Sequence, residues 1–211
     1  MHSDSNSVTD HAGHIPWNKD RLIGPKPPLK LREICAIRIR LQLAKRERDL
    51  ALFNLAIDSK LRGCDLVKLQ VRDVVHNGKA VSRATVLQQK TGQTVKFELT
   101  DQTREAVETW IAKAQLTPGQ FLFPSRTTQS QHISTRQYAR IVKSWVVRIG
   151  LDPSDYGTHS LRRTKATLIY KRTKNIRAIQ LLLGHTKLES TVRYLGIEVD
   201  DALEMSEQTE I

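Results

Sequence analysis

Six residues in this sequence carry side chains that could together break and rejoin a phosphodiester bond. They are two arginines, two histidines, a lysine and a tyrosine: Arg62, Lys90, His159, Arg162, His185 and Tyr194. Two guanidinium groups can hold the non-bridging oxygens of a phosphate and stabilise the added charge of the transition state. A tyrosine hydroxyl can attack phosphorus, and a lysine can protonate the departing oxygen. The set could therefore catalyse phosphoryl transfer, and we expect no metal and no cofactor.

A tyrosine nucleophile needs neighbours that favour its ionised form. With an ordinary pKa of about 10, only about one tyrosine in a thousand is ionised at neutral pH. That shortage corresponds to roughly 4 kcal/mol, which nearby cations and a histidine base can offset.

Each motif is weak evidence when it is taken alone. His159 and Arg162 are spaced to share one face of a helix, but such pairs are common. Gly184 and His185 also fit a helix C-cap followed by a surface histidine, and Tyr194 alone fits a core aromatic. Only the combination indicates catalysis.

The combination resembles the tyrosine recombinase (phage integrase) family over about residues 31–197. Residues 60–69 (KLRGCDLVKL) resemble the family's first arginine box, in which Arg62 is followed three residues later by Asp65. Residues 159–164 (HSLRRT) resemble the second box.

The remaining motifs continue the resemblance in the same order. Residues 183–185 (LGH) are similar to the third box, and Lys90 matches the family's β-hairpin lysine. Tyr194 follows His185 at the family's nucleophile spacing.

The resemblance implies a role for each residue. Arg62 and Arg162 would clamp the phosphate, Lys90 would be the general acid, and Tyr194 the nucleophile. A second group would assist: His159 as the acid/base partner of the nucleophile, His185 as a further donor to the phosphate, and Asp65 as a supporting residue that orients or buffers the charges.

The reaction implied by the resemblance joins a DNA 3′-phosphate to the tyrosine and frees a 5′-hydroxyl. A 5′-hydroxyl from a partner strand then attacks, and strands exchange through a Holliday junction without ATP. The implied partners are double-stranded DNA, further copies of the protein in a tetrameric synapse, and an accessory DNA-bending protein.

One departure from the family concerns the N-terminal side. Most members carry a separate helical core-binding domain there, whereas here only residues 1–29 precede the first expected helix. The short invertases of fimbrial phase switching are similarly built, so catalysis is still expected, with weaker clamping of DNA or with help from another protein.

Two rival functions and three rival nucleophiles stay open. A DNA-binding regulator with this fold but little turnover would need the cations without the tyrosine, and a type IB topoisomerase would share the chemistry. Tyr138, Tyr156 and Tyr170 are alternative nucleophiles, which the spacing from His185 disfavours.

The elements that must position these residues are mostly helical. Apolar residues at helical spacing predict helices from Leu31 and over about residues 47–60, 104–114, 134–149, 159–171, 175–183 and 188–195. Asp101 is the expected N-cap of the helix at 104–114. The helix at 47–60 is apolar on more than one side, so we expect it at the centre of the core.

A change of period indicates a small sheet between these helices. Val95, Phe97 and Leu99 alternate with polar residues, and residues 81–87 are rich in β-branched and apolar types. We therefore predict a small antiparallel sheet at about 70–100, with Lys90 near the tip of its last hairpin. The expected fold class is α+β: a mostly helical catalytic domain with a small antiparallel sheet.

The charge indicates a polyanionic partner. The formal net charge is +12, and the tail 198–211 has six acidic residues without any Lys or Arg, so the rest of the chain is more basic still. Such a field favours nucleic acid. We expect three parts: a flexible arm at 1–29, the catalytic domain at 30–197, and an acidic tail at 198–211.

Other features of the composition argue against membrane or secreted classes. No apolar run is long enough to span a bilayer, and the first residues lack the pattern of a secretory signal. We expect a cytoplasmic protein that associates with the nucleoid when bound to DNA. Cys35 and Cys64 lie among apolar residues and are expected to be buried thiols.

Overall fold

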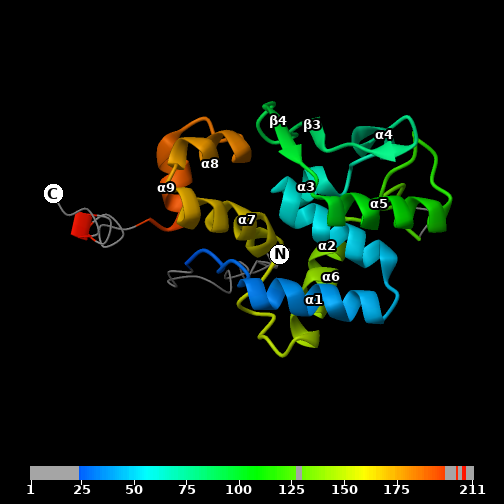
Figure 1. The fold of residues 1–211 in the computed structure, drawn as a ribbon, viewed down its shortest axis with the longest axis horizontal. Helices are drawn as coiled ribbons and strands as arrows, with labels where there is room; N and C mark the ends of the chain where they lie inside the picture. Colours follow the sequence, from blue (N-terminus) through cyan, green and yellow to red (C-terminus); the bar gives the residue numbers. More distant parts are fainter. Residues whose placement is uncertain (1–23, 127–129, 198–202, 204–205, 208–211) are drawn as a thin grey trace, which may run out of the picture.

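Helix α2 (Glu47–Ser59) runs through the middle of the protein (Figure 1). The computed structural model describes residues 24–126, 130–197, 203 and 206–207. Asp49 and all residues from Ala51 to Ser59 are buried, because α2 packs against α1, α5, α7 and β4. The prediction that this helix is central to the core is confirmed.

The order of elements is helical, then a short β region, then helical again. The remaining helices are α1 (Leu31–Leu43), α3 (Gly63–Leu66), α4 (Val71–Val74), α5 (Asp101–Ala114), α6 (Thr135–Arg148), α7 (Thr158–Thr173), α8 (Ile176–Leu183) and α9 (Leu188–Leu195). The strands are β1 (Val75–His76), β2 (Lys79–Ala80), β3 (Arg83–Leu87) and β4 (Thr94–Glu98). The predicted helices therefore exist at nearly the predicted bounds.

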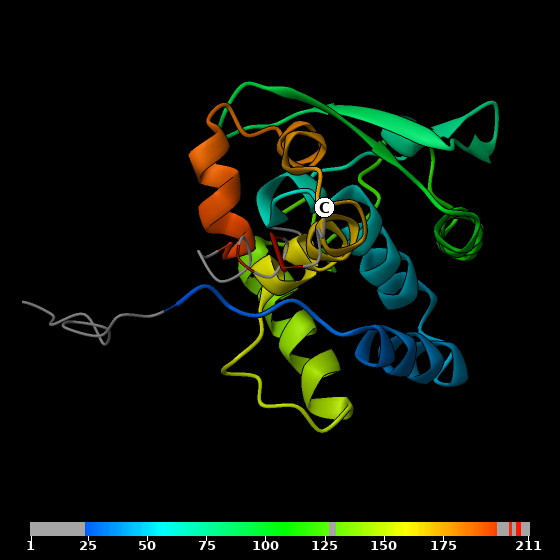
Figure 2. The ribbon, with the colours of Figure 1, turned by 60° about the vertical axis from the view of Figure 1, so that its left-hand side comes forward.

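The β region consists of two antiparallel pairs, β1 with β2 and β3 with β4, rather than one sheet. Ala84 pairs with Phe97 and Val86 with Val95, so the alternating apolar residues face the core. Lys90 lies in the turn that joins β3 to β4, as predicted. Figure 2 shows this hairpin crossing the top of the molecule towards α8, which contacts β4.

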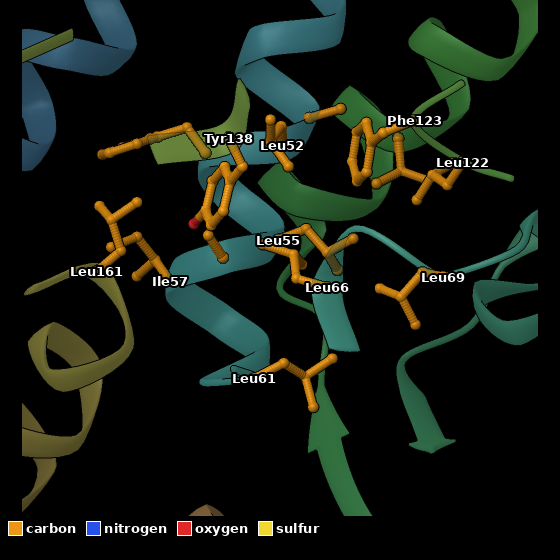
Figure 3. Packing of buried hydrophobic residues seen from close by; sticks show 14 of the residues in the cluster. Leu52, Leu55, Ile57, Leu61, Leu66, Leu69, Leu122, Phe123, Tyr138 and Leu161 are labelled. Atoms are coloured by element: carbon orange, nitrogen blue, oxygen red, sulfur yellow. The ribbon is translucent and has the colours of Figure 1, made fainter. Parts of the chain in front are cut away.

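The hydrophobic core is built around α2. Phe53 meets Trp145 of α6 edge to face, with ring centroids 5.4 Å apart. Figure 3 shows Leu52 and Leu55 of α2 in one cluster with Leu66, Phe123 and Tyr138. A smaller cluster joins α7, α8 and α9 through Ala166, Tyr170, Ile179 and Leu183.

The expected N-cap of α5 is wrong by one residue. Thr100 is the N-cap, with extended backbone angles, and Asp101 begins the helix and pairs with Arg104. The reason is a tertiary contact: the backbone N–H and the hydroxyl of Thr100 both donate to the buried Asp58 carboxylate. Sequence propensity for a cap is overridden by that partner.

The expectation of buried cysteines is also wrong. Cys35 is exposed and Cys64 is half-buried. In α1 the face that meets the core is formed by Ile34, Ile37 and Leu41, and Cys35 lies on the other side. Leu31, which the helical spacing also suggested, is exposed as well.

Part of the expected N-terminal arm lies within the described residues. Residues 24–29 lie along α7: Leu29 is buried, and its N–H donates to Thr164 Oγ1 at 3.0 Å. The Lys26 ammonium donates to the carbonyl of Ser154 at 2.6 Å. Residues 1–23, and most of the acidic tail at 198–211, lie outside the described residues.

None of the helices among the described residues is both long enough and apolar enough to cross a membrane.

The burial pattern predicts a large difference between two leucine-to-alanine variants. Leu52 is 0% exposed in the core and Leu43 is 80% exposed at the end of α1. Leu52→Ala should lower the free energy of unfolding by about 2–5 kcal/mol, because it leaves a cavity. Leu43→Ala should change it by no more than roughly 0.5 kcal/mol. Urea denaturation of both variants tests this, and equal losses would contradict the packing described.

Candidate active site

Four segments that are distant in the sequence place the six candidate residues. Arg62 is the N-cap of α3, directly after α2, and His159 and Arg162 lie in the first turns of α7. His185 follows α8 and Tyr194 is on α9. Helix α7 contacts α2, α8 and α9, which gathers these residues beside the β3–β4 hairpin.

Arg162 is buried at the centre of the site, with 3% of its surface exposed. Its Nη2 donates to the carbonyl oxygen of Leu183, at the end of α8, at 2.9 Å. Its Nη1 is also buried and has no hydrogen-bond partner among the described residues. A buried donor without a partner is costly, so this nitrogen is suited to an acceptor supplied by a ligand.

Gln88 connects Arg62 to the rest of the site, and the sequence analysis missed it. The Gln88 side chain accepts a hydrogen bond from Arg62 Nη1 and donates to the Leu183 carbonyl at 3.2 Å. The Thr91 hydroxyl donates to the same Gln88 oxygen at 3.0 Å. Gln88 is therefore the common partner of Arg62, the turn that carries Lys90, and the end of α8. Nothing in the local sequence distinguishes it from Gln89.

Asp65 holds the hairpin turn from the other side. It is buried, and its Oδ1 accepts the backbone N–H of Gln89, next to Lys90, at 2.9 Å. Its Oδ2 is unpartnered within the described part of the chain. Asp65 thus anchors the turn of the exposed Lys90, which fits the supporting position expected from the sequence.

Gly184 is required for the placement of His185. Its φ of +64° is a left-handed conformation that ends α8 and turns the chain. A Cβ on residue 184 would overlap Val95 Cγ1 of β4, so a larger residue would push α8 off the hairpin. The glycine therefore allows both the turn and the close contact.

His185 lies between Thr191 and Tyr194. Its Nδ1 is 3.1 Å from Thr191 Oγ1, and its ring meets the Tyr194 ring edge to face at 5.4 Å. Burial, together with the charges of Arg162 and Arg62, lowers the pKa of His185 to about 4. The ring is therefore neutral at physiological pH.

The Tyr194 hydroxyl is buried, and no described residue hydrogen-bonds its oxygen with ordinary geometry. Burial raises the pKa of Tyr194 to about 12, although the charges of Arg162, Arg163 and Arg62 act in the opposite direction. The Cζ atoms of Arg162 and Arg163 lie 5.9 Å and 5.2 Å from the centre of its ring. Arg163 is a second residue that the sequence analysis did not assign, although it stands inside the HSLRRT motif.

His159 is exposed at the mouth of the site. Desolvation by its surroundings lowers its pKa, and the nearby charges of Arg162, Arg163, Arg62 and Lys90 lower it further. The Lys90 turn and the start of α7 thus lie within electrostatic range of each other. A neutral imidazole is the form that can accept a proton from a nucleophile.

The three alternative tyrosines have other surroundings. Tyr138 is fully buried in the main core, where desolvation raises its pKa. Tyr156 precedes α7 and packs against the main core, while Tyr170 lies farther along α7, beside Lys174. The ring of Tyr194 meets His185 edge to face and lies beside Arg162.

The chemistry of the site is cationic. In the part of the chain that the structure describes, no group of three or more His, Cys, Asp or Glu side chains could hold a metal ion. What the cluster offers is guanidinium donors, a neutral imidazole and a hydroxyl, which are groups that suit an oxyanion such as a phosphate.

Comparison with known proteins identifies close sequence relatives. The model of the phage integrase family matches residues 31–199. The probable integrase/recombinase YoeC of Bacillus subtilis strain 168 is 32% identical over 162 residues, which covers 75% of this chain and 82% of that protein. Tyrosine recombinase XerC of Erythrobacter litoralis strain HTCC2594 is 29% identical, over 72% of this chain and 47% of XerC. The chain thus spans about half the length of the XerC relatives it matches.

Solved structures share the fold at lower identity. XerA recombinase matches with a TM-score of 0.70 at 20% identity, covering 88% of this chain and 64% of XerA. XerH bound to its difH substrate in a pre-cleavage complex matches with a TM-score of 0.67 at 18% identity, covering 88% of this chain and 55% of XerH. The catalytic domain of bacteriophage HP1 integrase matches with a TM-score of 0.54 at 16% identity, covering 85% of this chain and 95% of that domain. The expected α+β fold is confirmed.

The depressed pKa of His185 predicts a specific dependence of stability on pH. The unfolded chain takes up this proton near pH 6.5, whereas the folded chain does so only near pH 4. Between those values the unfolded state binds more protons, so the free energy of unfolding falls as the pH falls. His185→Gln should flatten this fall in thermal melts from pH 6.5 to 4.

The matched control is His76→Gln, an exposed position on β1 outside the site, which should keep the wild-type slope. An unchanged slope in His185→Gln would show that the imidazole is not buried as described.

Proposed function

Because the chain belongs to the phage integrase family, we propose that it is a site-specific DNA recombinase that cleaves and rejoins strands through a 3′-phosphotyrosine at Tyr194. The reaction would integrate, excise or invert a DNA element. It belongs to the tyrosine-type enzymes, which need neither metal nor ATP.

One observation supports this proposal above the others. The Tyr194 hydroxyl and Arg162 Nη1 are both buried polar atoms, and neither makes a hydrogen bond of ordinary geometry among the described residues, although Arg162 is close enough to act on the pKa of Tyr194. They belong to side chains that are close to each other and to His185. Since unpartnered buried polar atoms are rare, a ligand with several acceptor oxygens is the natural occupant, and a phosphodiester has this chemistry.

The proposed cleavage step assigns a task to each residue. Tyr194 Oη attacks phosphorus, forming the P–O bond to tyrosine and breaking the bond to the 5′-oxygen. The tyrosine proton passes to His159, and Lys90 protonates the departing 5′-oxygen. A second set stabilises or supports the phosphate: Arg62 and Arg162 hold its non-bridging oxygens, His185 donates a hydrogen bond to it, and Asp65 keeps the Lys90 turn in place.

Ionisation of Tyr194 is unfavourable in the DNA-free protein. A pKa of about 12 leaves roughly one molecule in 10⁵ as phenolate at neutral pH. Three guanidinium groups already act to lower that pKa, and their effect grows once water is excluded by DNA. Proton transfer to His159 during attack avoids forming a free phenolate.

The partners that fit this proposal follow from charge and from the relatives. Double-stranded DNA is the expected substrate of a chain with a net charge of +12. Strand exchange between two duplexes requires four protomers on DNA, so we propose a tetrameric synapse, with an accessory DNA-bending protein aiding assembly. We place this activity in the cytoplasm, on the nucleoid.

Covalent catalysis at Tyr194 is tested by trapping the adduct. A DNA substrate with a nick near the cleavage point should yield a protein–DNA adduct that survives SDS and forms in EDTA. Tyr194→Phe should abolish the adduct and leave DNA binding nearly unchanged, because it removes only a hydroxyl. Tyr170→Phe on α7 is the matched control and should retain the adduct. Adduct formation by Tyr194→Phe would refute the nucleophile, and plasmid relaxation without junctions would indicate a topoisomerase instead.

Lys90 as general acid is tested by changing the leaving group. Lys90→Ala should slow cleavage of normal DNA by about 10²–10⁴, because an alkoxide leaves poorly without a proton. Sulfur in place of the bridging 5′-oxygen leaves as a thiolate, so Lys90→Ala should recover most of its activity on that substrate.

Two comparisons make the Lys90 test decisive. Lys96→Ala, an exposed lysine on β4, should cleave both substrates at nearly the wild-type rate. Arg62→Ala and Arg162→Ala should be slow on both, since they act on the non-bridging oxygens. Equal defects of Lys90→Ala on both substrates would make Lys90 a binding residue.

A further inference from the structure

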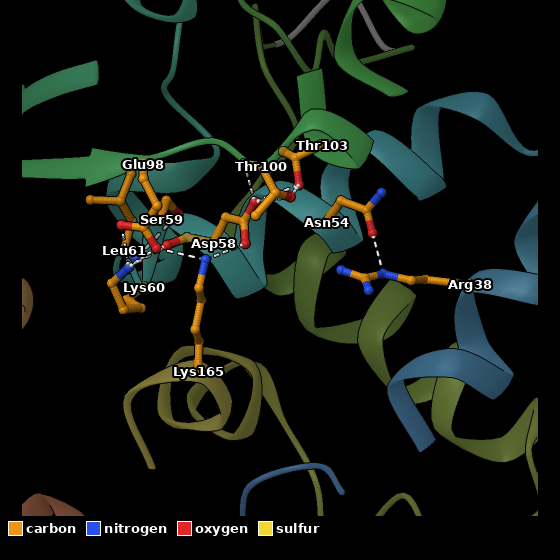
Figure 4. Close-up of polar contacts among 10 residues, drawn as sticks. All are labelled: Arg38, Asn54, Asp58, Ser59, Lys60, Leu61, Glu98, Thr100, Thr103 and Lys165. Atoms are coloured by element: carbon orange, nitrogen blue, oxygen red, sulfur yellow. Dashed lines mark hydrogen bonds and ion pairs between the residues drawn. The ribbon is translucent and has the colours of Figure 1, made fainter. Parts of the chain in front are cut away.

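Four charged side chains meet at the C-terminal end of α2 (Figure 4). Lys165 Nζ lies 2.6 Å from Asp58 Oδ1 and 2.6 Å from Glu98 Oε1. Lys60 Nζ lies 3.1 Å from Glu98 Oε1 and donates to the Asp58 carbonyl at 2.5 Å. Two cations and two anions thus form one network without net charge.

The network is largely shielded from water. Asp58 is 2% exposed, the side chains of Lys60 and Lys165 are 0% and 20% exposed, and that of Glu98 is 37% exposed. Burying charges is expensive, and well-packed apolar residues commonly stabilise a fold as much as a buried ion pair does. Overall stability therefore does not explain well why four charges lie here. Ion pairs also fix the relative positions of the elements that carry them, which apolar packing does not do.

Three of the segments that carry proposed catalytic groups contribute a charge to this network: the end of α2 before Arg62, strand β4 of the Lys90 hairpin, and α7. Asp58 and Lys60 precede Arg62 by four and two residues, and Lys60 has a positive φ that turns the chain from α2 towards Arg62. Glu98 ends β4, the second strand of the Lys90 hairpin. Lys165 follows Arg162 by three residues on α7.

Asp58 is held in place by hydrogen bonds from outside the network. Its Oδ2 accepts hydrogen bonds from the Thr100 N–H at 2.8 Å, the Thr100 hydroxyl at 2.7 Å and the Thr103 hydroxyl at 2.6 Å. These donors tie the carboxylate to the start of α5. Lys165, by contrast, is the member that reaches the network from α7.

The charge states at neutral pH support this geometry. Burial alone would lower the pKa of Lys165, but its hydrogen bonds to Asp58 and Glu98 outweigh burial and raise it. Burial would raise the pKa of Asp58, but Lys165 and the threonine donors lower it. Lys165 and Asp58 therefore stay ionised and attract each other.

We propose that Lys165 is a positioning residue for DNA cleavage. Its ammonium bridges Asp58 of α2 and Glu98 of β4, and so sets the distance of Arg162 and His159 on α7 from Arg62 and Lys90. This inference rests on the proposed function, and it concerns side chains outside the proposed catalytic set.

The test compares variants in α7 by single-turnover cleavage of a nicked substrate, with thermal melts and DNA affinity measured in parallel. Lys165→Met keeps the length of the side chain but removes its charge, so cleavage should slow by about 10- to 100-fold as the reacting groups lose alignment. DNA affinity should change little. Lys165→Arg should restore part of the rate, and Lys171→Met, on the exposed face of α7, should cleave normally.

A second variant tests the contact between the network and the β3–β4 hairpin, and it remains informative if Lys165→Met folds poorly. Glu98→Gln removes the carboxylate that links β4 to both lysines, so Lys90 should lose its alignment. Its defect should therefore be several-fold smaller on DNA with a bridging 5′-sulfur than on normal DNA. A residue that only stabilised the fold would give equal defects on both substrates.

The outcomes separate this inference from the proposed function. If wild-type protein forms the adduct, and both Lys165→Met and Glu98→Gln cleave at wild-type rates below their melting temperatures, the network only stabilises the fold and this inference is overturned. Wild-type protein that forms no adduct would overturn the proposed function and this inference with it.

Discussion

The carbonyl oxygen of Leu183, at the end of α8, accepts hydrogen bonds from both the Arg162 guanidinium and the Gln88 side chain. Its place in the site depends on Gly184, whose left-handed turn ends α8 and lets it lie against Val95 of the hairpin. If this contact were lost, Arg162 would lose its hydrogen bond to α8, and Gln88 would lose its link to α8. Three elements are therefore joined by one backbone acceptor.

The charged side chains form two regions, one with an excess of positive charge and one that is neutral. Around Tyr194, the cations Arg62, Arg162 and Arg163 outnumber the one nearby carboxylate, Asp65. Burial, and after it the charges of Arg162 and Arg62, lower the pKa values of His159 and His185. At the C-terminal end of α2, Lys60 and Lys165 are matched by Asp58 and Glu98. A site with an excess of positive charge attracts a phosphate, whereas the neutral network holds the surrounding elements without competing for it.

The state of Tyr194 links these regions to function. Its hydroxyl is buried and its pKa is raised to about 12, so the DNA-free protein holds the proposed nucleophile in its protonated form. A phenolate in this position would be reactive at all times, whereas a neutral phenol becomes a nucleophile only when a base such as His159 takes its proton. The same surroundings that suppress ionisation place the ring beside two guanidinium groups.

Local structure and the choice of candidate residues could be predicted from the sequence. Periodicity depends on neighbouring residues only, so the helices, the β3–β4 hairpin and the position of Lys90 at its turn were predictable. The order of Arg62, Lys90, His159, Arg162, His185 and Tyr194 was also sufficient to indicate the family, which the family match confirms. The roles of these residues stay predictions.

Which side chains meet depends on how distant segments pack. Gln88 has no local signature, and the motif that contains Arg163 does not show that its side chain reaches Tyr194. The partners Asp58 and Lys165 are 107 residues apart, so no pattern within a segment could reveal them. Periodicity shows which side of a helix is apolar. It does not show how much of that side the neighbouring elements cover, and for this reason Cys35 and Leu31 are exposed although they were expected to be buried or to face the core. The cap at Thr100 instead of Asp101 has the same origin, because a distant carboxylate, Asp58, binds the threonine. Local propensities amount to a few tenths of a kcal/mol per residue, and a buried, charge-assisted hydrogen bond outweighs them.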